Sequence, residues 1–435
     1  MKILNSLKSA LDEKTATIGI IGLGYVGLPL LLRFADVGYS VVGIDIDIDK
    51  INKLNSNETY IKHISSEKIK AASERFTASS DFSLAKKCDA LIICVPTPLD
   101  KFRSPDLSFV LNTMDAILPY LRPGQIVSLE STTWPGTTEE ELLPRIESTG
   151  LKIGSDIALI FSPEREDPGN QKFSTSTIPK VVGGITRQCL EVGLSLYGKV
   201  IDRTVPVSST RVAELTKLLE NIHRAVNIGL VNEIKIIADK MGIDIYEVIR
   251  AASTKPFGFV PYFPGPGLGG HCIPIDPFYL TWKAKEFGIT SRFIEIAGEV
   301  NSVMPDWVVS KVQDALNDRH KSVKGARILI LGISYKKNID DIRESPSLKL
   351  MESLRSKGGI IDYSDPYFID FPRTKEHSFN LKSISLDPDT IASYDCILIA
   401  TNHDIFDFNM ILNYARLIID TRGVYLEKFP NVVRA

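Results

Sequence analysis

Residues 17–45 read TIGIIGLGYVGLPLLLRFADVGYSVVGID, and this stretch decides the fold. The apolar run 17–22 predicts a short buried strand, and a glycine-rich turn leads from it into helical periodicity over 25–37. A second strand, SVVGID, then ends at Asp45. A strand, a helix and a strand within about thirty residues have the size of one βαβ unit. The stretch therefore predicts two neighbouring parallel strands.

The same rhythm continues on both sides of a long helix. Near-continuous apolar runs, which are typical of parallel strands covered on both faces, occur at 90–95, 125–131, 157–162, 326–332, 358–366, 395–401 and 416–423. Between these groups, residues 208–242 have helical periodicity interrupted only by Gly229 before their end, and Ser208 or Ser209 can cap the start. A Pro- and Gly-rich segment follows at 255–270, and then a helical stretch over 276–318. The sequence predicts an α/β fold of two doubly wound Rossmann-like domains joined by a long central helix.

Bulk properties narrow the class of protein. The chain has 435 residues and a net charge of −2, so no basic excess points to a nucleic-acid partner. It has no apolar run long enough for a membrane span, and its N-terminus lacks a signal-peptide pattern. The five cysteines are irregularly spaced and none has the spacing of a zinc ligand. We expect a cytoplasmic protein without disulfides, without a metal and without a membrane partner.

The glycine turn carries a dinucleotide-binding pattern. Gly22 allows the tight turn, Gly24 lets the backbone approach a pyrophosphate, and Gly27 lets helix and strand pack closely. Asp45 at the end of the second strand would bind the ribose hydroxyls and repel a 2′-phosphate, which favours NAD over NADP. The alternative is a glycine turn without a ligand. Pro96 and Thr97, after the strand 90–95, either contact the cofactor or form a rigid exit turn, and the sequence weighs these equally.

A candidate nucleophile follows the second glycine-rich segment. Cys272 comes directly after the loop Gly267-Leu268-Gly269-Gly270 and His271. Exposed backbone amides in such a loop would lower a thiol pKa and stabilise an oxyanion. An ordinary buried thiol is an equally good interpretation of the spacing alone. His271 faces away from its neighbour in most geometries, so a structural role is favoured for it.

Several segments in order along the chain resemble the UDP-glucose and GDP-mannose dehydrogenase family, the nucleotide-sugar 6-dehydrogenases. They are GLGYVGLPL (22–30), GIDID (43–47), CVPTP (94–98), the Ser131-Thr132 turn, FSPERE (161–166), ELTKLLEN (214–221), GGHCIPIDP (269–277) and SYKKNIDDIRESPS (334–347). The resemblance covers nearly the whole chain. Within the family, SPEREDPGN (162–170) and FPGPGLGGHCIPIDP (263–277) are most similar to members that oxidise UDP-N-acetylhexosamines, UDP-N-acetylglucosamine above all.

The resemblance implies an activity and its residues. A sugar CH₂OH is oxidised to a carboxylate with two NAD, through a thiohemiacetal and a thioester on Cys272, in the synthesis of surface-polysaccharide precursors. The implied catalytic residues are Thr132, Glu164, Lys217, Asn221, Cys272 and Asp276. The implied cofactor-binding residues are Gly22, Gly24, Tyr25, Val26, Gly27, Asp45, Pro96, Thr97 and Thr132. The implied substrate-binding residues are Glu164, Arg165, Lys217, Asn221, Gly269, Lys336, Arg343 and Arg422.

Some of these assignments leave alternatives. Arg343 could equally pair with Asp340 or Asp341, and Trp134, where many members have an aliphatic residue, either shapes the pocket or fills space. The substrate could also be UDP-glucose, UDP-N-acetylmannosamine or UDP-N-acetylgalactosamine. Two further readings are a two-electron dehydrogenase of the 3-hydroxyacid type, which needs no cysteine, and an inactive nucleotide-sugar-binding protein.

The predicted division of the chain follows from these assignments. Residues 1–206 are expected to bind NAD, 207–315 to form a central helical region with the cysteine loop, and 316–435 to bind the UDP-sugar. The reaction is expected in the cleft between the two end domains. A long helix of this kind exposes apolar area when it stands alone, so we expect a homodimer through the central helices.

Overall fold

The computed structural model describes residues 2–61, 64–100, 102–165, 173–270, 273–372, 374 and 377–435. The chain divides into two compact units. The first comprises Met1–Glu220 and Phe278–Thr290, and the second comprises Asn221–Pro277 and Ser291–Ala435. The long helix α8 (Thr210–Lys240) contributes to both units. The three-part division expected from the sequence stays a prediction.

The first unit is built on an eight-stranded sheet of order β3-β2-β1-β4-β5-β6-β7-β8. Its strands are β1 (Thr17–Ile21), β2 (Ser40–Ile44), β3 (Phe76–Ser79), β4 (Ala90–Ile93), β5 (Gln125–Leu129), β6 (Ile157–Phe161), β7 (Lys180–Gly184) and β8 (Thr204–Val207). The order of the first six is that of dinucleotide-binding domains, in which the strand order reverses between β1 and β4. All paired strands are parallel except β6 and β7. That antiparallel pair was not predicted from the sequence.

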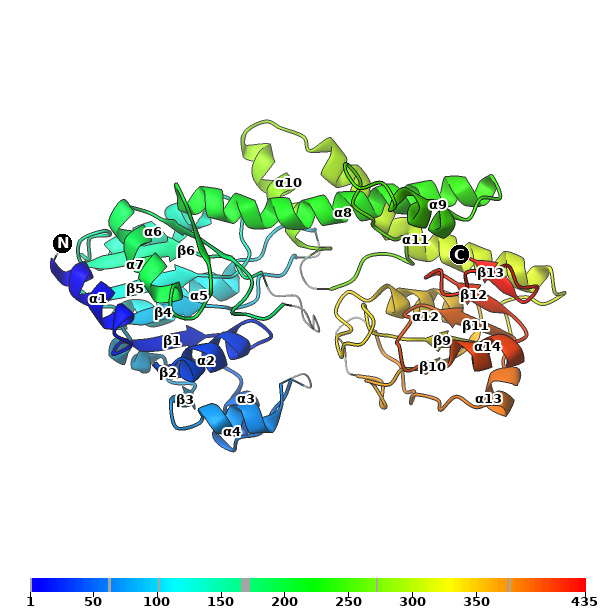
Figure 1. The fold of residues 1–435 in the computed structure, drawn as a ribbon, viewed down its shortest axis with the longest axis horizontal. Coiled ribbons are helices and arrows are strands. Elements are labelled where there is room, and N and C mark those ends of the chain that lie inside the picture. The colour runs from blue at the N-terminus through cyan, green and yellow to red at the C-terminus, as the bar shows by residue number, and fades with distance from the viewer. Residues whose placement is uncertain are drawn as a thin grey trace. The chain divides into compact units, whose positions relative to one another are not determined.

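Helices cover this sheet (Figure 1). The α-helices of the first unit are α1 (Lys2–Asp12), α2 (Gly27–Asp36), α3 (Ile48–Asn55), α4 (Ser66–Ala72), α5 (Ser108–Ile117), α6 (Leu143–Glu147), α7 (Arg187–Tyr197) and α10 (Asp276–Glu286), with short turns η1 (Phe82–Lys87), η2 (Leu118–Tyr120) and η3 (Thr138–Leu142). Helix α1 packs on α7 and buries Leu4, Leu7 and Leu11, which lie at helical spacing on one face. The Tyr39 hydroxyl donates to the Leu11 carbonyl over 2.6 Å and so fixes the end of α1.

The second unit is built on a five-stranded sheet of order β10-β9-β11-β12-β13, in which every pairing is parallel. Its strands are β9 (Arg327–Leu331), β10 (Ile360–Ser364), β11 (Cys396–Ile399), β12 (Ile418–Asp420) and β13 (Val432–Arg434). Its helices besides α8 are α9 (Ile245–Ala252), α11 (Arg292–Asn317), α12 (Pro346–Ser356), α13 (Pro388–Ala392) and α14 (Phe408–Tyr414). Alternate residues of β9 enter separate cores: Ile328 and Ile330 belong to one cluster, and Leu329 and Leu331 to the other. This sheet is therefore covered on both faces, as its continuous apolar runs predict.

The fold class predicted from the sequence is confirmed, with corrections to single elements. Helix α8 has 31 residues, and the Ser209 hydroxyl accepts from the Val212 amide at its start, which settles the choice of cap. The helical stretch predicted over 276–318 is two helices, because Gly288 with φ +69° ends the first of them. Within the described part of the chain, no helix is long and apolar enough to cross a membrane.

Candidate functional site

The glycine turn after β1 has the geometry that a bound pyrophosphate needs. Gly22 has φ +91°, and a Cβ there would lie 2.6 Å from the Cys94 carbonyl oxygen. A Cβ on Gly27, the first residue of α2, would lie 1.8 Å from the carbonyl oxygen of Gly22. At Gly24, by contrast, a Cβ would meet no atom within 4 Å. Two glycines are thus required by packing, and the third leaves an open approach to the N-terminus of α2. The turn fits NAD.

Asp45 lies at the end of β2, beside this turn. One carboxylate oxygen accepts from the Leu23 amide over 2.7 Å and the other from the Asp47 amide over 2.9 Å. The Lys50 ammonium lies 3.4 Å from the first oxygen. These contacts hold a negative charge next to Gly22 and Gly24, where the sequence predicts ribose recognition. Tyr25 and Val26 are half-buried in the same turn.

The exits of β4 and β5 are joined to each other. The Ser131 hydroxyl donates to the Val95 carbonyl over 2.7 Å, and the Tyr279 hydroxyl donates to the Thr97 carbonyl over 2.9 Å. Pro96 is exposed and Thr132 is half-buried at this edge of the sheet. Both exits lie next to the β1–β4 reversal, where doubly wound domains bind their ligands.

The same turn contains two buried polar atoms without a partner among the described residues, Thr133 Oγ1 and Trp134 Nε1. Trp134 is 7% exposed and packs against Trp282, with ring centroids 4.6 Å apart, and against Tyr279. Trp134 is thus packed among aromatic side chains within the first unit.

Lys217 and Glu164 form a buried ion pair in the first unit. The Lys217 ammonium donates to the Glu164 backbone carbonyl over 2.7 Å and lies 3.1 Å from its carboxylate. Lys217 is 5% exposed and Glu164 is 9% exposed. The neighbouring Arg165 guanidinium is bound on both sides, by the Glu220 carboxylate at 2.6 Å and the Pro179 carbonyl at 2.6 Å. Two predicted site residues are therefore brought together, while Arg165 anchors the segment beside them.

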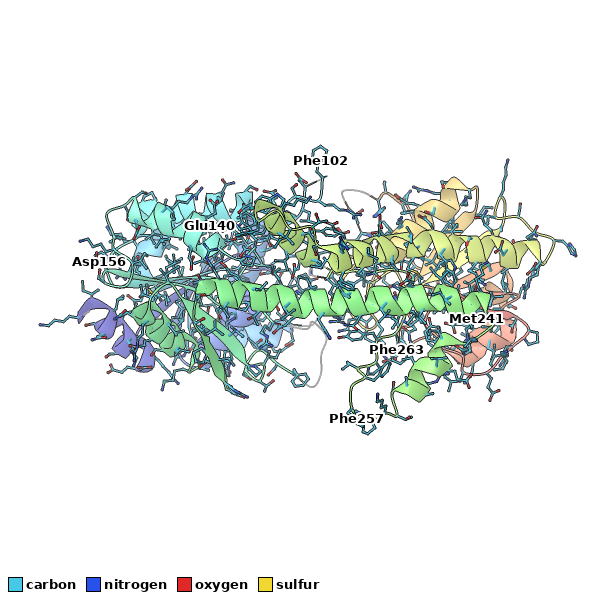
Figure 2. All side chains as sticks on the ribbon, turned by 90° about the horizontal axis from the view of Figure 1, so that it is seen from above. Phe102, Glu140, Asp156, Met241, Phe257 and Phe263 are labelled. Atoms are coloured by element: carbon cyan, nitrogen blue, oxygen red, sulfur yellow. The ribbon has the colours of Figure 1, made fainter. Side chains whose placement is uncertain are left out.

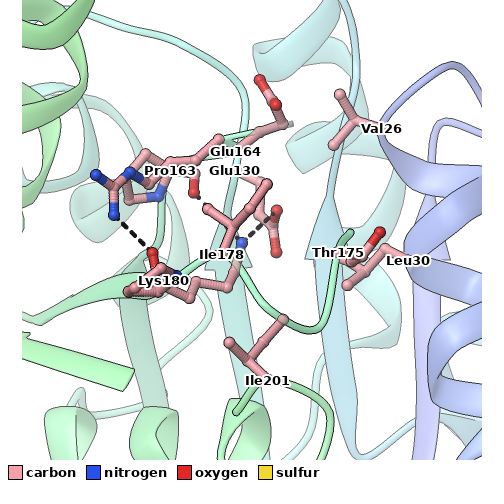
Figure 3. Close-up of a pocket in the computed structure, with 11 residues that line it drawn as sticks. Val26, Leu30, Glu130, Pro163, Glu164, Thr175, Ile178, Lys180 and Ile201 are labelled. Atoms are coloured by element: carbon pink, nitrogen blue, oxygen red, sulfur yellow. Dashed lines mark hydrogen bonds and ion pairs between the residues drawn. The ribbon is translucent and has the colours of Figure 1, made fainter. Parts of the chain in front are cut away.

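A small cavity of about 30 Å³ lies below this segment (Figure 3). Its polar lining includes Glu130, Glu164 and Lys180, and Val26, directly before α2, and the α2 residue Leu30 also line it. The Lys180 ammonium binds the Glu130 carboxylate at 2.8 Å and the Pro163 carbonyl at 3.3 Å. A cavity of this size has room for about two water molecules. Sequence reasoning missed this ion pair, because its partners lie fifty residues apart outside any recognisable motif.

In the second unit, Asn221 and Asp276 are brought together by a hydrogen bond from the Asn221 amide to the Asp276 carboxylate. Asp276 is buried. The predicted substrate residue Gly269 packs so closely that a Cβ would lie 2.5 Å from Tyr335 Cβ. Cys272 and His271 lie outside the described residues. Their predicted roles rest on the sequence.

The glycine loop before them is held at several points. The Gly265 amide donates to Asn232 Oδ1 over 3.0 Å, and the Gly270 amide donates to the Arg343 carbonyl over 2.9 Å. Asn232 itself donates to Asn301 over 2.9 Å. Both asparagines are buried, so the loop that leads to Cys272 is tied to helices α8 and α11 through satisfied amides.

The three basic residues predicted to bind the diphosphate have different settings. Arg343 pairs with Asp341 at 2.6 Å, one of the two alternatives that the sequence offered. The Arg422 guanidinium donates to the Ala400 carbonyl over 2.7 Å, and its pKa is lowered from the usual value by burial. Lys336 is half-buried. Arg422 approaches Gly265 closely enough that a Cβ there would lie 2.7 Å from its Nη1.

Two cysteines outside the predicted site, Cys88 and Cys396, are buried. Burial raises the pKa of the Cys88 thiol to about 12 and also raises that of Cys396, so neither ionises near neutral pH. Among the residues that the structure describes, no group of three or more His, Cys, Asp or Glu side chains is placed to hold a metal ion.

Three models of one family match the chain in succession. The NAD binding domain of the UDP-glucose/GDP-mannose dehydrogenase family matches residues 16–201, its central domain matches 211–303, and its UDP binding domain matches 329–427.

Individual relatives agree with these matches. A UDP-N-acetyl-D-glucosamine 6-dehydrogenase from Pseudomonas aeruginosa is 36% identical over 397 residues, which cover 90% of this chain and 92% of that protein. A UDP-N-acetyl-D-mannosamine dehydrogenase from Pyrococcus horikoshii is 33% identical over 422 residues, 94% of this chain and 96% of that one. A solved structure of UDP-D-ManNAc dehydrogenase from Pyrococcus horikoshii matches with a TM-score of 0.85 at 31% identity, covering 96% of this chain and 98% of the other.

The domain matches cover most of the chain, and the glycine turn of the first unit has the geometry that their NAD binding domain requires. The cofactor is therefore NAD, and the third domain is a UDP binding domain. The chain belongs to the UDP-glucose/GDP-mannose dehydrogenase family, whose members are NAD-dependent oxidoreductases.

Proposed function

We propose that this protein oxidises the C6 hydroxymethyl group of a UDP-N-acetylhexosamine to the carboxylate, with UDP-N-acetylglucosamine as the favoured substrate. The observation that carries the proposal is the buried Lys217–Glu164 pair. It presents an ammonium, which stabilises an alkoxide, beside a carboxylate, which orients water or accepts a proton. The four-electron reaction uses two NAD, each of which accepts one hydride when bound.

The proposed route runs through a covalent adduct of Cys272. The first oxidation turns the alcohol into an aldehyde and releases one proton. The Cys272 thiolate forms a C–S bond to the aldehyde carbon, and the oxygen takes a proton to give a thiohemiacetal. Loss of the second hydride and of that proton leaves a thioester. Water then cleaves the C–S bond, releasing the carboxylate and the thiol, so the reactive aldehyde is never free.

The other proposed roles are those that the family resemblance implies, and the chemistry of the residues fits them. Lys217 stabilises the alkoxide and the later oxyanions, because its ammonium is buried and electrostatic effects are stronger away from water. Glu164 orients the water that attacks the thioester, with Thr132 holding a second water near the sugar. Asn221 and Asp276 form the corresponding polar pair of the second unit. Lys336, Arg343 and Arg422 are proposed to bind the diphosphate.

The choice of sugar rests on sequence similarity. The relative from Pseudomonas aeruginosa is named for UDP-N-acetyl-D-glucosamine at 36% identity, whereas several relatives at 32–33% identity are named for UDP-N-acetyl-D-mannosamine. These sugars differ at C2, so the pocket geometry around that carbon decides between them.

The test is the number of NADH molecules formed per UDP-sugar consumed, over a panel of UDP-N-acetylglucosamine, UDP-N-acetylmannosamine, UDP-N-acetylgalactosamine and UDP-glucose. Two NADH per UDP-N-acetylglucosamine, lost in Cys272→Ala, are expected. Cys88→Ala is the matched control, because this buried thiol has no proposed role. One NADH per sugar, or activity that survives Cys272→Ala, would instead identify a two-electron dehydrogenase. A complete lack of turnover with intact UDP-sugar binding would identify an inactive binding protein.

We further propose that the protein is a homodimer through its central helices. In the second unit, Leu230, Ile234 and Ile237 lie at helical spacing on α8 and are exposed, and Met241, directly after the helix, is 66% exposed. Phe257 and Phe263 project from the segment after α9 (Figure 2). Large apolar side chains grouped in this way mark an association surface. Light scattering should give twice the chain mass, and Ile237→Lys should shift it to the monomer. A monomer of the unmodified protein at micromolar concentration would contradict this proposal.

A further inference from the structure

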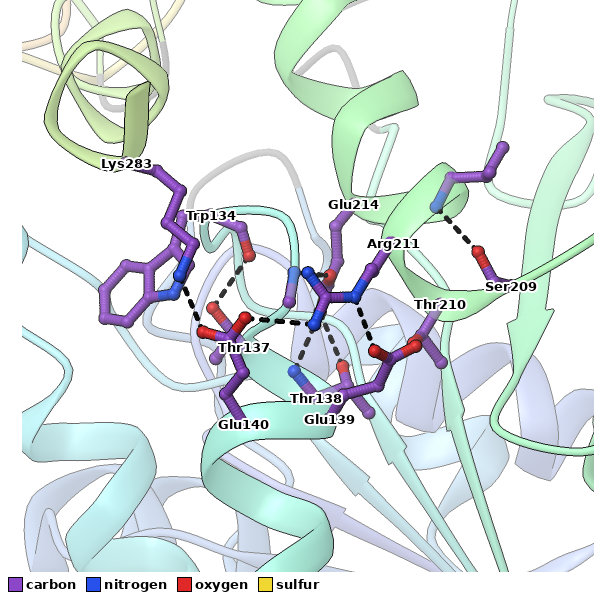
Figure 4. Close-up of polar contacts among 12 residues, drawn as sticks. Trp134, Thr137, Thr138, Glu139, Glu140, Ser209, Thr210, Arg211, Glu214 and Lys283 are labelled. Atoms are coloured by element: carbon purple, nitrogen blue, oxygen red, sulfur yellow. Dashed lines mark hydrogen bonds and ion pairs between the residues drawn. The ribbon is translucent and has the colours of Figure 1, made fainter. Parts of the chain in front are cut away.

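Glu214 is a fully buried carboxylate that none of the proposed catalytic steps uses. It lies on α8, three residues before Lys217, and is 0% exposed. One oxygen accepts from the Gly136 amide over 2.6 Å. The other accepts from the Thr138 amide over 2.9 Å and from the Thr138 hydroxyl over 2.7 Å. Three donors of one short segment therefore converge on a single side chain (Figure 4).

That segment connects β5 to η3 and lies at the cofactor edge of the first sheet. It begins with Ser131, whose hydroxyl is bound to the exit of β4 at Val95. Doubly wound domains place the second half of a dinucleotide over the strands that follow the reversal, here β4 and β5. Residues 131–138 thus border the place of the nicotinamide half, and Thr132 belongs to them.

Further polar contacts from α8 reach the neighbouring η3, where the Thr210 hydroxyl donates to the Glu139 carboxylate over 3.3 Å. Arg211 of α8 also reaches η3, pairing with Glu139 and Glu140, and Lys283 of α10 pairs with Glu140 at 2.6 Å. The Arg211, Glu139 and Glu140 side chains are all 30% exposed or more, so their pairs contribute little to position. Hydrogen bonds to a buried carboxylate are stronger and directional.

We propose that Glu214 is a positioning residue of the NAD site, which holds residues 131–138 in the conformation that receives the nicotinamide half of NAD. The proposal deepens the proposed function, because it rests on the placement of Thr132 at the cofactor. Preorganisation of this kind saves the ordering of a turn at the moment of binding, and it acts on NAD affinity more than on affinity for the UDP-sugar.

The charge of Glu214 gives the proposal a second signature. Burial raises the pKa of Glu214 to about 7, with the amide of Gly136 and both donors of Thr138 opposing the shift and the nearby Glu139 charge adding to it. The ionised carboxylate accepts these bonds more strongly than the protonated form. The affinity for NAD should therefore rise between pH 6 and pH 8. The other charged groups that face this site are Glu140, Arg211 and Lys283, and the pKa shifts of these three keep them charged over this range.

The experiment is calorimetric titration of NAD, and separately of UDP, into the full-length protein at pH 6, 7 and 8. Glu214→Gln should weaken NAD binding about tenfold at pH 8, as expected for the loss of charge-assisted bonds, and should flatten its pH dependence. Thr138→Val, which removes one of the three donors, should weaken NAD about threefold. Glu139→Gln, one residue beyond this segment and in a partly exposed pair, should leave NAD affinity within twofold.

UDP binding should stay within twofold in all three variants. NAD affinity unchanged in folded Glu214→Gln at every pH would overturn the proposal. A lower melting temperature with unchanged NAD affinity would likewise overturn it, by showing a purely structural role. Because binding needs no turnover, these results do not depend on the oxidation chemistry. Failure of the thioester route would appear only in the count of NADH.

Discussion

The turns after β1 and after β9 have the same backbone arrangement but different surrounding side chains. In the first, Gly22 follows β1 with φ +91°, and the next amide, Leu23, donates to Asp45 directly after β2 over 2.7 Å. In the second, Gly332 follows β9 with φ +79°, and the Ile333 amide donates to Asp365 directly after β10, again over 2.7 Å. In both units, therefore, the chain leaves the strand through a glycine with positive φ, and an aspartate after the neighbouring strand binds the amide that follows.

The side chains around the two turns then diverge. Gly24 leaves open space in the first unit, whereas its counterpart Ser334 is buried and donates to Asp365. Asp45 keeps Lys50 as an accessible partner, whereas Asp365 lies against His403 at 3.2 Å with both side chains fully buried. The first turn leaves open space beside a carboxylate, whereas the Ser334 side chain takes up the corresponding space in the second. One backbone design thus carries an NAD site in one unit and a UDP binding domain in the other.

Gly27→Ala, at the start of the helix that follows the first turn, is expected to have the largest effect on stability and on NAD binding. The added methyl would lie 1.8 Å from the Gly22 carbonyl oxygen, so α2 must move off β1. We expect a loss of more than about 4 kcal/mol, the range of exceptional substitutions, and no NAD binding. Urea denaturation with NAD and UDP titrations measures this.

Gly24→Ala is the matched control for that change, since its methyl meets no protein atom. It should leave the free energy of unfolding nearly unchanged and still weaken NAD strongly. Equal stability of the two variants would mean that helix α2 shifts to make room for the methyl group, and that packing in the first turn does not require Gly27.

Asp365→Asn should have the next largest effect, this time on the second unit. It would leave His403 buried beside an amide and place NH₂ against the Ile333 and Ser334 amides. Breaking a buried pair from one side typically costs about 3 kcal/mol. Asp362→Asn on the same strand removes only a half-exposed partner of Tyr394 and should cost less than about 1 kcal/mol. Unfolding should show the difference while NAD affinity stays unchanged.

The local parts of both turns could be predicted from sequence, because they depend on neighbours in the chain. GLGYVG between two apolar runs predicts β1, the turn and α2, and ELTKLLEN places Lys217 and Asn221 one helical turn apart. Strands β3, β7, β8 and β13 carry short or polar runs that do not stand out, and they were not predicted.

The supporting contacts could not be predicted, since they join distant segments. Glu214 meets Thr138 across 76 positions, Lys180 meets Glu130 across 50, and Asp365 meets His403 across 38. Nothing in the sequence around any of these residues identifies its partner. Reactive groups lie in recognisable local patterns, whereas the groups that hold them in place do not.

Two buried acids sharpen the comparison through their opposite pH dependence. Burial raises the pKa of Glu214 to about 7 from 4.5. In Asp365, burial also acts to raise the pKa, but the hydrogen bond and charge of His403 with the Tyr367 and Ile333 amides lower it below 3.8. The folded state with Glu214 binds a proton that the unfolded state has lost, so its contribution to stability falls as pH rises from about 4.5 to 7. The contribution of Asp365 is present above pH 4 and is lost as pH falls below it.

The measurement is the free energy of unfolding of the protein and of Glu214→Gln between pH 5 and pH 8. The difference between them should change by up to about 3 kcal/mol across this range, in favour of the variant at high pH. Asp362→Asn, which removes a half-exposed carboxylate of the second unit, serves as the control. A difference for Glu214→Gln that does not change with pH would contradict the opposite titration of the two acids.

The smallest expected effect is on cofactor choice, and Asp45→Asn tests it. Asn keeps an oxygen for the Leu23 amide but removes the charge that repels a 2′-phosphate. It also releases the Lys50 ammonium, now 3.4 Å from the carboxylate, to meet that phosphate. The ratio of NADP to NAD affinity should therefore rise about tenfold, equivalent to about 1.4 kcal/mol. Asp47→Asn makes the same change in net charge, and its side-chain oxygen can still accept from the Asp49 and Lys50 amides as the cap of α3, so it should leave both stability and the ratio nearly unchanged. An unchanged ratio in Asp45→Asn would mean that Asp45 only braces the turn, as Asp365 does in the second unit, and the functional difference between the two acids would disappear.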